Sequence, residues 1–316
     1  WMKKLGYFSL IMVVLFLAAC QPQASVNQEQ DSLSVVAVES FLADIVQNVA
    51  GDRLVVETLM PSGLDPHSFE PTPKDVAKIS DSDILFINGA GLEEWLVDII
   101  ETLPEDQLII EASAGLESRT EAEEDHAEDE MEKEIGHDHE YDPHFWFNPL
   151  LVVKYVENIR DGLISIDPEG AEIYTSNAEN YIVQLEELDQ YIQEKITQIP
   201  AERRLIVTNH ESFGYFADRY GFTVVGTILQ SVSSGASPSA QQIAELVEEM
   251  RSSGVSAIFM ETGSNSELAE QLSNETGIKV VYDLYTHSIS EEGGNAPNYI
   301  ELMKYNVEQM VSALAD

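Results

Sequence analysis

Residues 168–199, "PEGAEIYTSNAENYIVQLEELDQYIQEKITQI", have the longest regular apolar pattern that bears on the fold. Its apolar residues recur at three- and four-residue steps, the spacing of one face of an α-helix; they are Ile173, Tyr181, Leu185, Leu188, Ile192 and Ile196. A helix of roughly 30 residues is about 45 Å long, which is more than one small lobe needs. We therefore predict a rigid helix that joins two lobes. A long surface helix is the simpler alternative.

Short apolar strands alternate with helices on both sides of this stretch. Strands are predicted at 33–38, 53–60 and 83–89 before it, and at 204–208, 222–228, 255–262 and 278–285 after it. Alternation of this kind indicates βαβ units and a mainly parallel sheet. The predicted fold is therefore α/β, with two lobes, each a mainly parallel sheet flanked by helices, joined by one long helix.

Capping residues mark the ends of several predicted helices. The first, 39–51, closes at Gly51, and a short one begins with Thr72 as N-cap in a capping box with Asp75. A helix over 211–220 is stopped by Gly221. The next has Ser237 as N-cap and Pro238 at its first position, and ends at Gly254. Two more helices are predicted, at 265–277 and from Pro297 onward.

The first residues predict export. Lys3 and Lys4 precede an apolar segment, 5–17, and two alanines follow it. This segment is shorter than the roughly 20 residues that span a membrane, so residues 1–19 are predicted to be a signal peptide. The stretch "LAAC" resembles a bacterial lipobox, which makes Cys20 a lipidated first residue on the outer face of the cell membrane. Residues 20–32 would then be a tether, 33–166 the N-terminal lobe, 167–199 the linking helix and 200–316 the C-terminal lobe.

The charge of the chain limits its partners. The formal net charge is −41, so nucleic acid is excluded, because binding phosphates requires a basic surface. Residues 117–143 contain a dense acidic run with His126, His137 and His139, and we predict that it is disordered without ligand. A run with imidazoles and carboxylates could capture metal weakly. A solvated charged loop is the alternative.

The other four histidines are His67, His144, His210 and His287, and none lies inside a predicted helix or strand. Three of them follow predicted strands, and ligands bind beyond the carboxyl ends of strands in open α/β sheets. A cleft between the lobes would bring all four together. Four neutral imidazoles suit Zn²⁺ better than Mn²⁺, Mg²⁺ or Ca²⁺, although Cu²⁺ would also accept them. The sequence therefore predicts a zinc site in the interlobe cleft.

The mature chain resembles the metal-binding lipoproteins that serve as substrate-binding proteins of zinc and manganese ABC importers. The motifs that carry the resemblance come in the expected order: the lipobox, "GLDPHSFEPTPKD", the acidic loop, "DPHFWFNP", "HESFGYFADRYG", "SGASPSAQQIAEL" and "THSISEEG". The resemblance implies two lobes, one rigid helix, and metal delivery to a membrane permease with its ATPase.

The resemblance also implies ligands. His67, His144 and His210 match ligand positions of the family, and a histidine at the third position points to zinc, since manganese-type members tend to have glutamate there. Family members generally have a carboxylate at the fourth position, where this chain has "THS". We assign His287 as the fourth ligand, with Asp283 as the fallback.

Other functions remain open at this stage. In a zinc-dependent hydrolase Glu211 could act as the base, but four histidines would close the coordination sphere and no "HExxH" occurs. A manganese- or iron-specific member of the family, or a metal-dependent adhesin or extracellular metal buffer, is the alternative. We expect a monomer and no enzymatic activity.

Overall fold

The structure is a computed structural model that describes residues 33–104, 107–119, 141–229 and 238–315. These residues belong to one compact unit, Leu33–Asp316. The predicted signal peptide, the tether with Cys20 and the histidines of the acidic run lie outside the described residues. The predicted division at 33–166, 167–199 and 200–316 stays a prediction.

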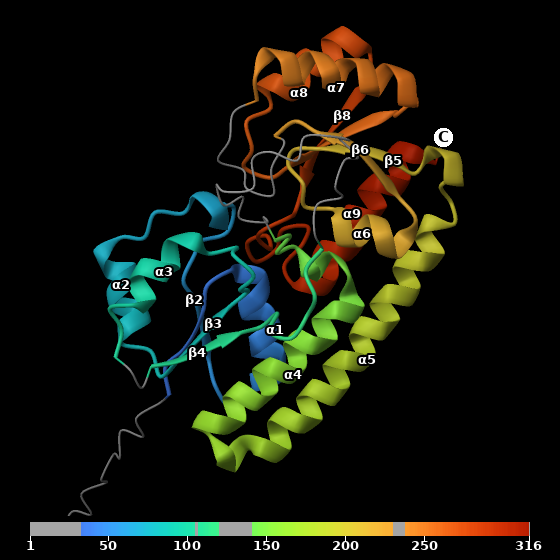
Figure 1. The fold of residues 1–316 in the computed structure, drawn as a ribbon. Helices are drawn as coiled ribbons and strands as arrows, with labels where there is room; N and C mark the ends of the chain where they lie inside the picture. The colour runs from blue at the N-terminus through green and yellow to red at the C-terminus, as the bar shows by residue number, and fades with distance from the viewer. Residues whose placement is uncertain (1–32, 105–106, 120–140, 230–237, 316) are drawn as a thin grey trace, which may run out of the picture. The chain divides into compact units, whose positions relative to one another are not determined.

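Two four-stranded parallel sheets form the framework (Figure 1). The N-terminal lobe contains the sheet β2-β1-β3-β4, with β1 Val35–Ala37, β2 Val56–Thr58, β3 Ile84–Ile87 and β4 Leu108–Glu111. The C-terminal lobe contains the sheet β6-β5-β7-β8, with β5 Leu205–Thr208, β6 Thr223–Thr227, β7 Ala257–Glu261 and β8 Lys279–Leu284. The predicted fold class is confirmed, and all pairs within the described sheets are parallel.

Helices cover the sheets, and side chains that alternate along the strands fill the cores on both faces. In β1, Val35 and Ala37 join one apolar cluster while Val36 joins another on the opposite face. The helices of the first lobe are α1 Ser40–Ala50, α2 Pro73–Ser80, α3 Val97–Ile100 and α4 Pro149–Ile166. After α5 Ala171–Ile196 come α6 Gly214–Tyr220, α7 Ala240–Ser253, α8 Glu267–Thr276 and α9 Tyr299–Leu314.

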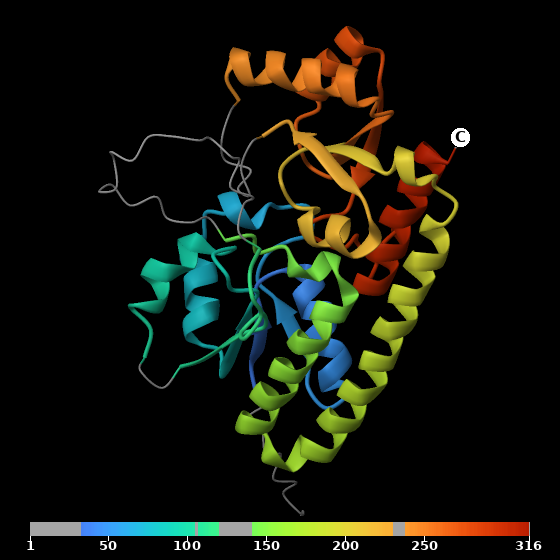
Figure 2. The same cartoon turned by 45° about the vertical axis from the view of Figure 1, so that its right-hand side comes forward.

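The long helix predicted at 168–199 is α5, which begins at Ala171 after a single 3-10 turn and ends at Ile196. Its buried side chains include Tyr181, Leu185 and Ile192, which lie on the predicted apolar face. α5 packs against α4 and α1 of the first lobe and against α9 of the second (Figure 2). α5 therefore packs against helices of both lobes.

Several predicted helix ends need correction. α7 is capped by Ser239 rather than Ser237, because the Ser239 hydroxyl and the Gln242 side chain form a capping box. α6 begins at Gly214 rather than 211, since the His210 carbonyl already accepts the Ser212 N–H and the Thr208 hydroxyl. The predicted capping box of α2 and the glycine stops of α6 and α7 are confirmed.

One further helix end differs from the prediction, and one strand was missed. α9 begins at Tyr299 rather than Pro297, because the Asn298 side chain accepts the Glu301 N–H. The strand β4 was not predicted. Within the described residues, no helix combines the length and the apolar character needed to cross a membrane.

Candidate metal centre

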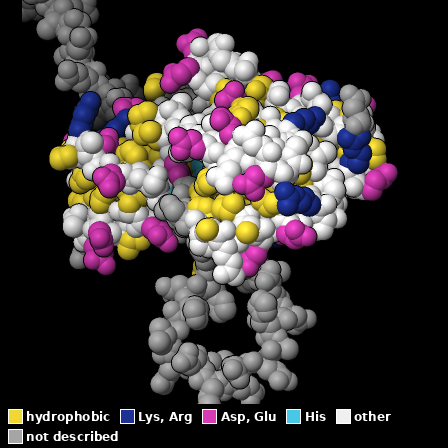
Figure 3. Space-filling model, turned by 90° about the horizontal axis from the view of Figure 1, so that it is seen from above, with side chains coloured by type: hydrophobic (Ala, Val, Ile, Leu, Met, Phe, Trp, Pro, Cys, Tyr) yellow, Lys and Arg dark blue, Asp and Glu magenta, His cyan; other side chains and the backbone are white. Residues whose placement is uncertain are grey.

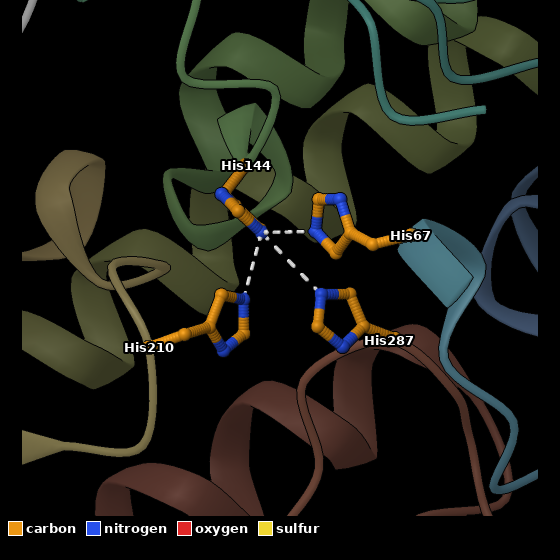
Figure 4. A group of neighbouring side chains, drawn as sticks. All are labelled: His67, His144, His210 and His287. Carbon is orange, nitrogen blue, oxygen red and sulfur yellow. Dashed lines mark hydrogen bonds between the residues drawn. The ribbon is translucent and has the colours of Figure 1, made fainter. Parts of the chain in front are cut away.

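Four loops bring the four histidines together (Figure 4). His67 lies in a 3-10 turn, Pro66–Ser68, after β2, and His144 directly precedes the turn Phe145–Phe147. His210 follows β5 by two residues and His287 follows β8 by three. One nitrogen from each ring lies within 4.8 Å of the others. The expectation that a cleft would gather these residues therefore agrees with their placement.

His144 is at the centre of the group. Its Nε2 atom lies 3.4 Å from Nε2 of His67, 3.2 Å from Nε2 of His210 and 3.3 Å from Nε2 of His287. Figure 4 shows the nitrogens of the other three rings directed toward that of His144. Four nitrogens that converge in this way supply four lone pairs to a single point, provided that the rings are neutral.

Burial keeps most of these rings neutral. His144 and His210 are fully buried and His287 is nearly so, whereas His67 is partly exposed. Burial, reinforced by the neighbouring rings, lowers the pKa of His67 to about 2 and holds the pKa values of His144 and His287 well below the ordinary value. Burial also acts to lower the pKa of His210, but the carboxylate of Glu261 outweighs it and raises that pKa.

Two buried carboxylates, Asp142 and Glu261, contact the rings from behind. Asp142 Oδ1 lies 2.8 Å from Nδ1 of His144. Glu261 Oε1 lies 2.5 Å from Nδ1 of His210, and its other oxygen lies 3.6 Å from Nδ1 of His287. Burial raises the pKa of Asp142 to about 6. Burial alone would raise the pKa of Glu261, but the charge and hydrogen bond of His210 lower it. Carboxylates in this position orient metal-binding imidazoles.

Sequence reasoning missed both carboxylates, although the chain carries a signal for one of them. The tripeptide "DPH" occurs twice, at 65–67 and at 142–144. In each copy the aspartate accepts the backbone N–H of the histidine at 3.0 Å. The repetition could therefore have marked Asp142 as a partner of His144. Glu261 has no such local signal, since it lies 51 residues from His210.

The fallback ligand, Asp283, lies elsewhere. It is exposed on β8, in a left-handed backbone conformation with φ of 66°, and it is not a member of the group of four histidines. Glu211, the base of the hydrolase hypothesis, is likewise outside that group. His126, His137 and His139 lie outside the described residues.

The aromatic segment after His144 ties the lobes together at the back of the site. Trp146 is fully buried, stacks on Phe41 of α1 and donates a hydrogen bond from Nε1 to the Thr286 carbonyl at 2.9 Å. Tyr299 of α9 donates to the Trp146 carbonyl at 2.6 Å. The apolar residues after His144 therefore fill the core next to the site.

A cavity of about 570 Å³ opens beside His287, and its lining includes Asp65, Asn209 and Glu261. On the face shown in Figure 3, acidic side chains outnumber basic ones. His67 belongs to a loop that contacts the second lobe. In this loop the Gly63 N–H donates to the Ser288 hydroxyl at 2.9 Å. A cation thus meets a mostly acidic surface outside and imidazole nitrogens within.

Comparison with known proteins identifies relatives over nearly the whole chain. The manganese-binding lipoprotein MntA of Halalkalibacterium halodurans is 36% identical and covers 99% of this chain and 100% of its own length. The manganese ABC transporter substrate-binding lipoprotein PsaA of Streptococcus anginosus is 34% identical with the same coverage. These relatives cover the chain from end to end.

Solved structures show the same fold. The periplasmic zinc binding protein TroA from Treponema pallidum superimposes with a TM-score of 0.80 at 27% identity, over 90% of this chain and 100% of that one. A Mn-bound periplasmic metal binding protein from Candidatus Liberibacter asiaticus gives a TM-score of 0.77 at 29% identity, with the same coverage. Residues 35–313 match the family described as "Zinc-uptake complex component A periplasmic", and the chain belongs to this family of metal-binding ABC transporter substrate-binding proteins.

Proposed function

We propose that this protein is an exported lipoprotein that captures Zn²⁺ with His67, His144, His210 and His287 and delivers it to the permease and ATPase of an ABC importer. The observation that carries the proposal is the convergence of four imidazole Nε2 atoms on one point in a largely buried site. Here the metal ion is the transported substrate, and the chain's own residues bind and release it.

The spacing of the nitrogens supports a small tetrahedral ion. In a regular tetrahedron with Zn–N bonds of about 2.0–2.1 Å, neighbouring nitrogens are about 3.3–3.4 Å apart. The three distances from Nε2 of His144 are 3.2, 3.3 and 3.4 Å. These three pairs need little rearrangement to bind Zn²⁺, while the pairs among the other three nitrogens, which lie within 4.8 Å of one another, would adjust to the same spacing.

The chemistry of the donors also favours zinc. Imidazole nitrogen is a borderline-soft ligand, which Zn²⁺ accepts more readily than Mn²⁺ does. Asp142 and Glu261 contact Nδ1 atoms, so the lone pairs of the Nε2 atoms stay directed at the metal. Their two negative charges would balance the charge of one divalent cation in a site that excludes most water.

Manganese is the second candidate because MntA and PsaA, the relatives described above, are named for it. A competition titration of the metal-free protein with Zn²⁺ and then Mn²⁺ separates the candidates. We expect one tight zinc site per chain, much weaker for manganese and weakened further in His287→Ala. Tight manganese binding, or zinc binding that does not depend on His287, would reject the four-histidine zinc site.

The variant His287→Asp sharpens this titration, since it replaces the fourth imidazole by a hard oxygen ligand. Zinc affinity should fall relative to manganese affinity, because Mn²⁺ prefers carboxylate ligands. Replacing His126, His137 and His139 together should leave the tight site unchanged and remove only the weak binding of additional zinc ions. If the ratio of zinc affinity to manganese affinity were unchanged in His287→Asp, residue 287 would not coordinate the ion.

Four protein ligands fill a tetrahedral site and leave no position for an activated water, so we propose that the protein has no hydrolytic activity; zinc-dependent turnover of peptide or ester substrates would contradict this. We also propose that Cys20 carries the lipid anchor on the outer face of the membrane. Cys20→Ala should release the protein from the membrane fraction of an expressing cell.

A further inference from the structure

Glu261 is the last residue of β7 and lies close to two of the four histidines. In the order β6-β5-β7-β8, β7 lies between β5 and β8. His210 follows β5 and His287 follows β8, so Glu261 ends between the two loops that carry the second lobe's histidines. Glu261 pairs in register with Leu284, the last residue of β8. The sheet topology therefore places a single carboxylate behind two rings.

The two oxygens of this carboxylate have different partners. Oε1 lies 2.5 Å from Nδ1 of His210. Oε2 accepts the hydroxyl hydrogen of Thr286 at 2.7 Å, and the same Thr286 oxygen lies 3.2 Å from Nδ1 of His287. Glu261, Thr286 and both rings are buried. A continuous set of hydrogen bonds thus runs from His210 through Glu261 and Thr286 to His287.

While Glu261 is ionised and both rings are neutral, only one arrangement of protons satisfies this set. An ionised carboxylate has no hydrogen to donate, so His210 must donate from Nδ1 and Thr286 must donate its hydroxyl hydrogen. The Thr286 oxygen then has lone pairs but no free hydrogen, so His287 must donate from Nδ1. Both rings consequently keep their protons on Nδ1, and both Nε2 atoms have free lone pairs.

We propose that Glu261 is a positioning residue that sets the tautomer of two metal-binding histidines at once, directly for His210 and through the Thr286 hydroxyl for His287. The proposal rests on the proposed metal-binding function for its consequence, but the tautomers are a property of the metal-free protein. Asp142 differs in this respect, since within the described chain the one histidine ring that it contacts by a hydrogen bond is that of His144.

Glu261→Gln gives the sharpest test. The amide that replaces the carboxylate has one acceptor oxygen and one NH₂ donor. If the oxygen faces His210, the NH₂ group donates to Thr286, whose hydroxyl hydrogen is then free to donate to Nδ1 of His287. If the amide is turned the other way, His210 must accept. In neither case does residue 261 hold the protons of both rings on Nδ1, so one ring can carry its proton on Nε2, where it blocks metal binding.

The tautomers can be read in metal-free protein from the ¹⁵N chemical shifts of the histidine rings. In the wild type we expect Nδ1–H at both His210 and His287. In Glu261→Gln, one of the two should change to Nε2–H. Asp189→Asn is the matched control, since Asp189 is also a buried carboxylate but accepts hydrogen bonds from Arg219 and Tyr220. Two unchanged Nδ1–H rings in Glu261→Gln would overturn the proposal.

A zinc titration of the same variants tests the consequence for binding. Glu261→Gln should lower Zn²⁺ affinity by about 10- to 100-fold, the usual effect of losing such a partner. Thr286→Val should give a smaller loss, Thr286→Ser should restore wild-type affinity, and Thr286→Val should add little in the Glu261→Gln background. If Thr286→Val lowered zinc affinity as much in the Glu261→Gln background as in the wild type, Thr286 would act independently of Glu261. That result would overturn the shared role.

The two sets of measurements also separate this proposal from the proposed function. Wild-type protein that binds no zinc would reject the zinc function, while the ¹⁵N shifts would still report whether Glu261 sets both tautomers. Wild-type protein that binds zinc tightly, with Glu261→Gln unchanged in both affinity and tautomers, would leave the function standing and reject the role of Glu261.

Discussion

Asp142 Oδ1 lies 2.8 Å from Nδ1 of His144 and also accepts the backbone N–H of the same residue at 3.0 Å. One oxygen therefore fixes both the backbone and the ring of the central histidine. We expect Asp142→Asn to lower Zn²⁺ affinity by about 10- to 100-fold, because the ring loses its orientation and its negatively charged partner. A competition titration against a chelator of known affinity measures the loss.

Asp218→Asn provides the matched control for Asp142→Asn. Asp218 forms an ion pair with Arg119, which also lies 3.6 Å from Asp142. Asp218 is exposed, whereas His144 is fully buried. Its substitution should leave zinc affinity unchanged. If the two variants lost equal zinc affinity, Asp142 would act through its ion pair with Arg119 and not through the ring of His144.

His67 differs from the other three candidate ligands. It is partly exposed, and within the described part of the chain no carboxylate is hydrogen-bonded to its ring, whereas His144 and His210 each have one. We expect His67→Ala to weaken zinc binding less than His144→Ala does, because His144 is the ring from which the other three are within 3.4 Å. Titrations of the two alanine variants under one buffer condition would settle the order, and a larger loss for His67→Ala would contradict it.

Metal should stabilise the folded chain. The four histidines come from both lobes, so an ion that binds all four joins distant segments of the chain. His67 and His287, the first and the last of them, are 220 residues apart in sequence. A ligand present at 1,000 times its Kd adds about 4 kcal/mol to the free energy of unfolding, which corresponds to an increase in Tm on the order of 10 °C for a domain of this size. Thermal unfolding with zinc and with excess chelator measures the difference.

His144→Ala is the control for the stabilisation by zinc. This variant should unfold at the same temperature with zinc as with chelator. If zinc raised the Tm of His144→Ala as much as that of the wild type, the ion would be stabilising the protein from another position.

The positions of the four histidines could be predicted because they follow from topology. Parallel strands end at one edge of a sheet, so His210 and His287, which follow two strands of the same sheet, were expected at the same edge. The linking helix was predictable as well, because the apolar spacing of α5 depends only on local sequence. The ligand roles of the histidines and the identity of the metal stay predictions.

What the sequence did not reveal depends on contacts made only in the folded chain. Glu261 lies in a strand whose apolar character is predictable, yet its closeness to His210 depends on the order of β5, β7 and β8. The start of α6 depends on the Ser212 N–H and the Thr208 hydroxyl, which both bond to the His210 carbonyl. Neither feature leaves a periodic pattern in the sequence.

Glu39 and Glu93, which follow β1 and β3, form a pair of buried carboxyl groups in the N-terminal lobe. Glu93 accepts the backbone N–H groups of Asn88 and Gly89 at 2.6 and 3.1 Å, while neither oxygen of Glu39 accepts a hydrogen bond from the described residues. Burial, with the nearby charge of Glu93, holds the pKa of Glu39 well above its ordinary value, and burial raises the pKa of Glu93 to about 7. The pair must therefore hold a proton at neutral pH.

The sign of the effect on stability follows from these raised pKa values. The folded chain retains protons that the unfolded chain releases above about pH 4.5, so folding stability falls as the pH rises through 7. Glu39→Gln removes one acid from the pair, and we expect the variant to gain stability relative to the wild type by about 1–3 kcal/mol between pH 5 and pH 8.5. Chemical denaturation across this range measures the gain, and Glu94→Gln, at an exposed neighbour, should show none. A difference between Glu39→Gln and wild type that stays constant with pH would mean that Glu39 is not protonated in the folded chain.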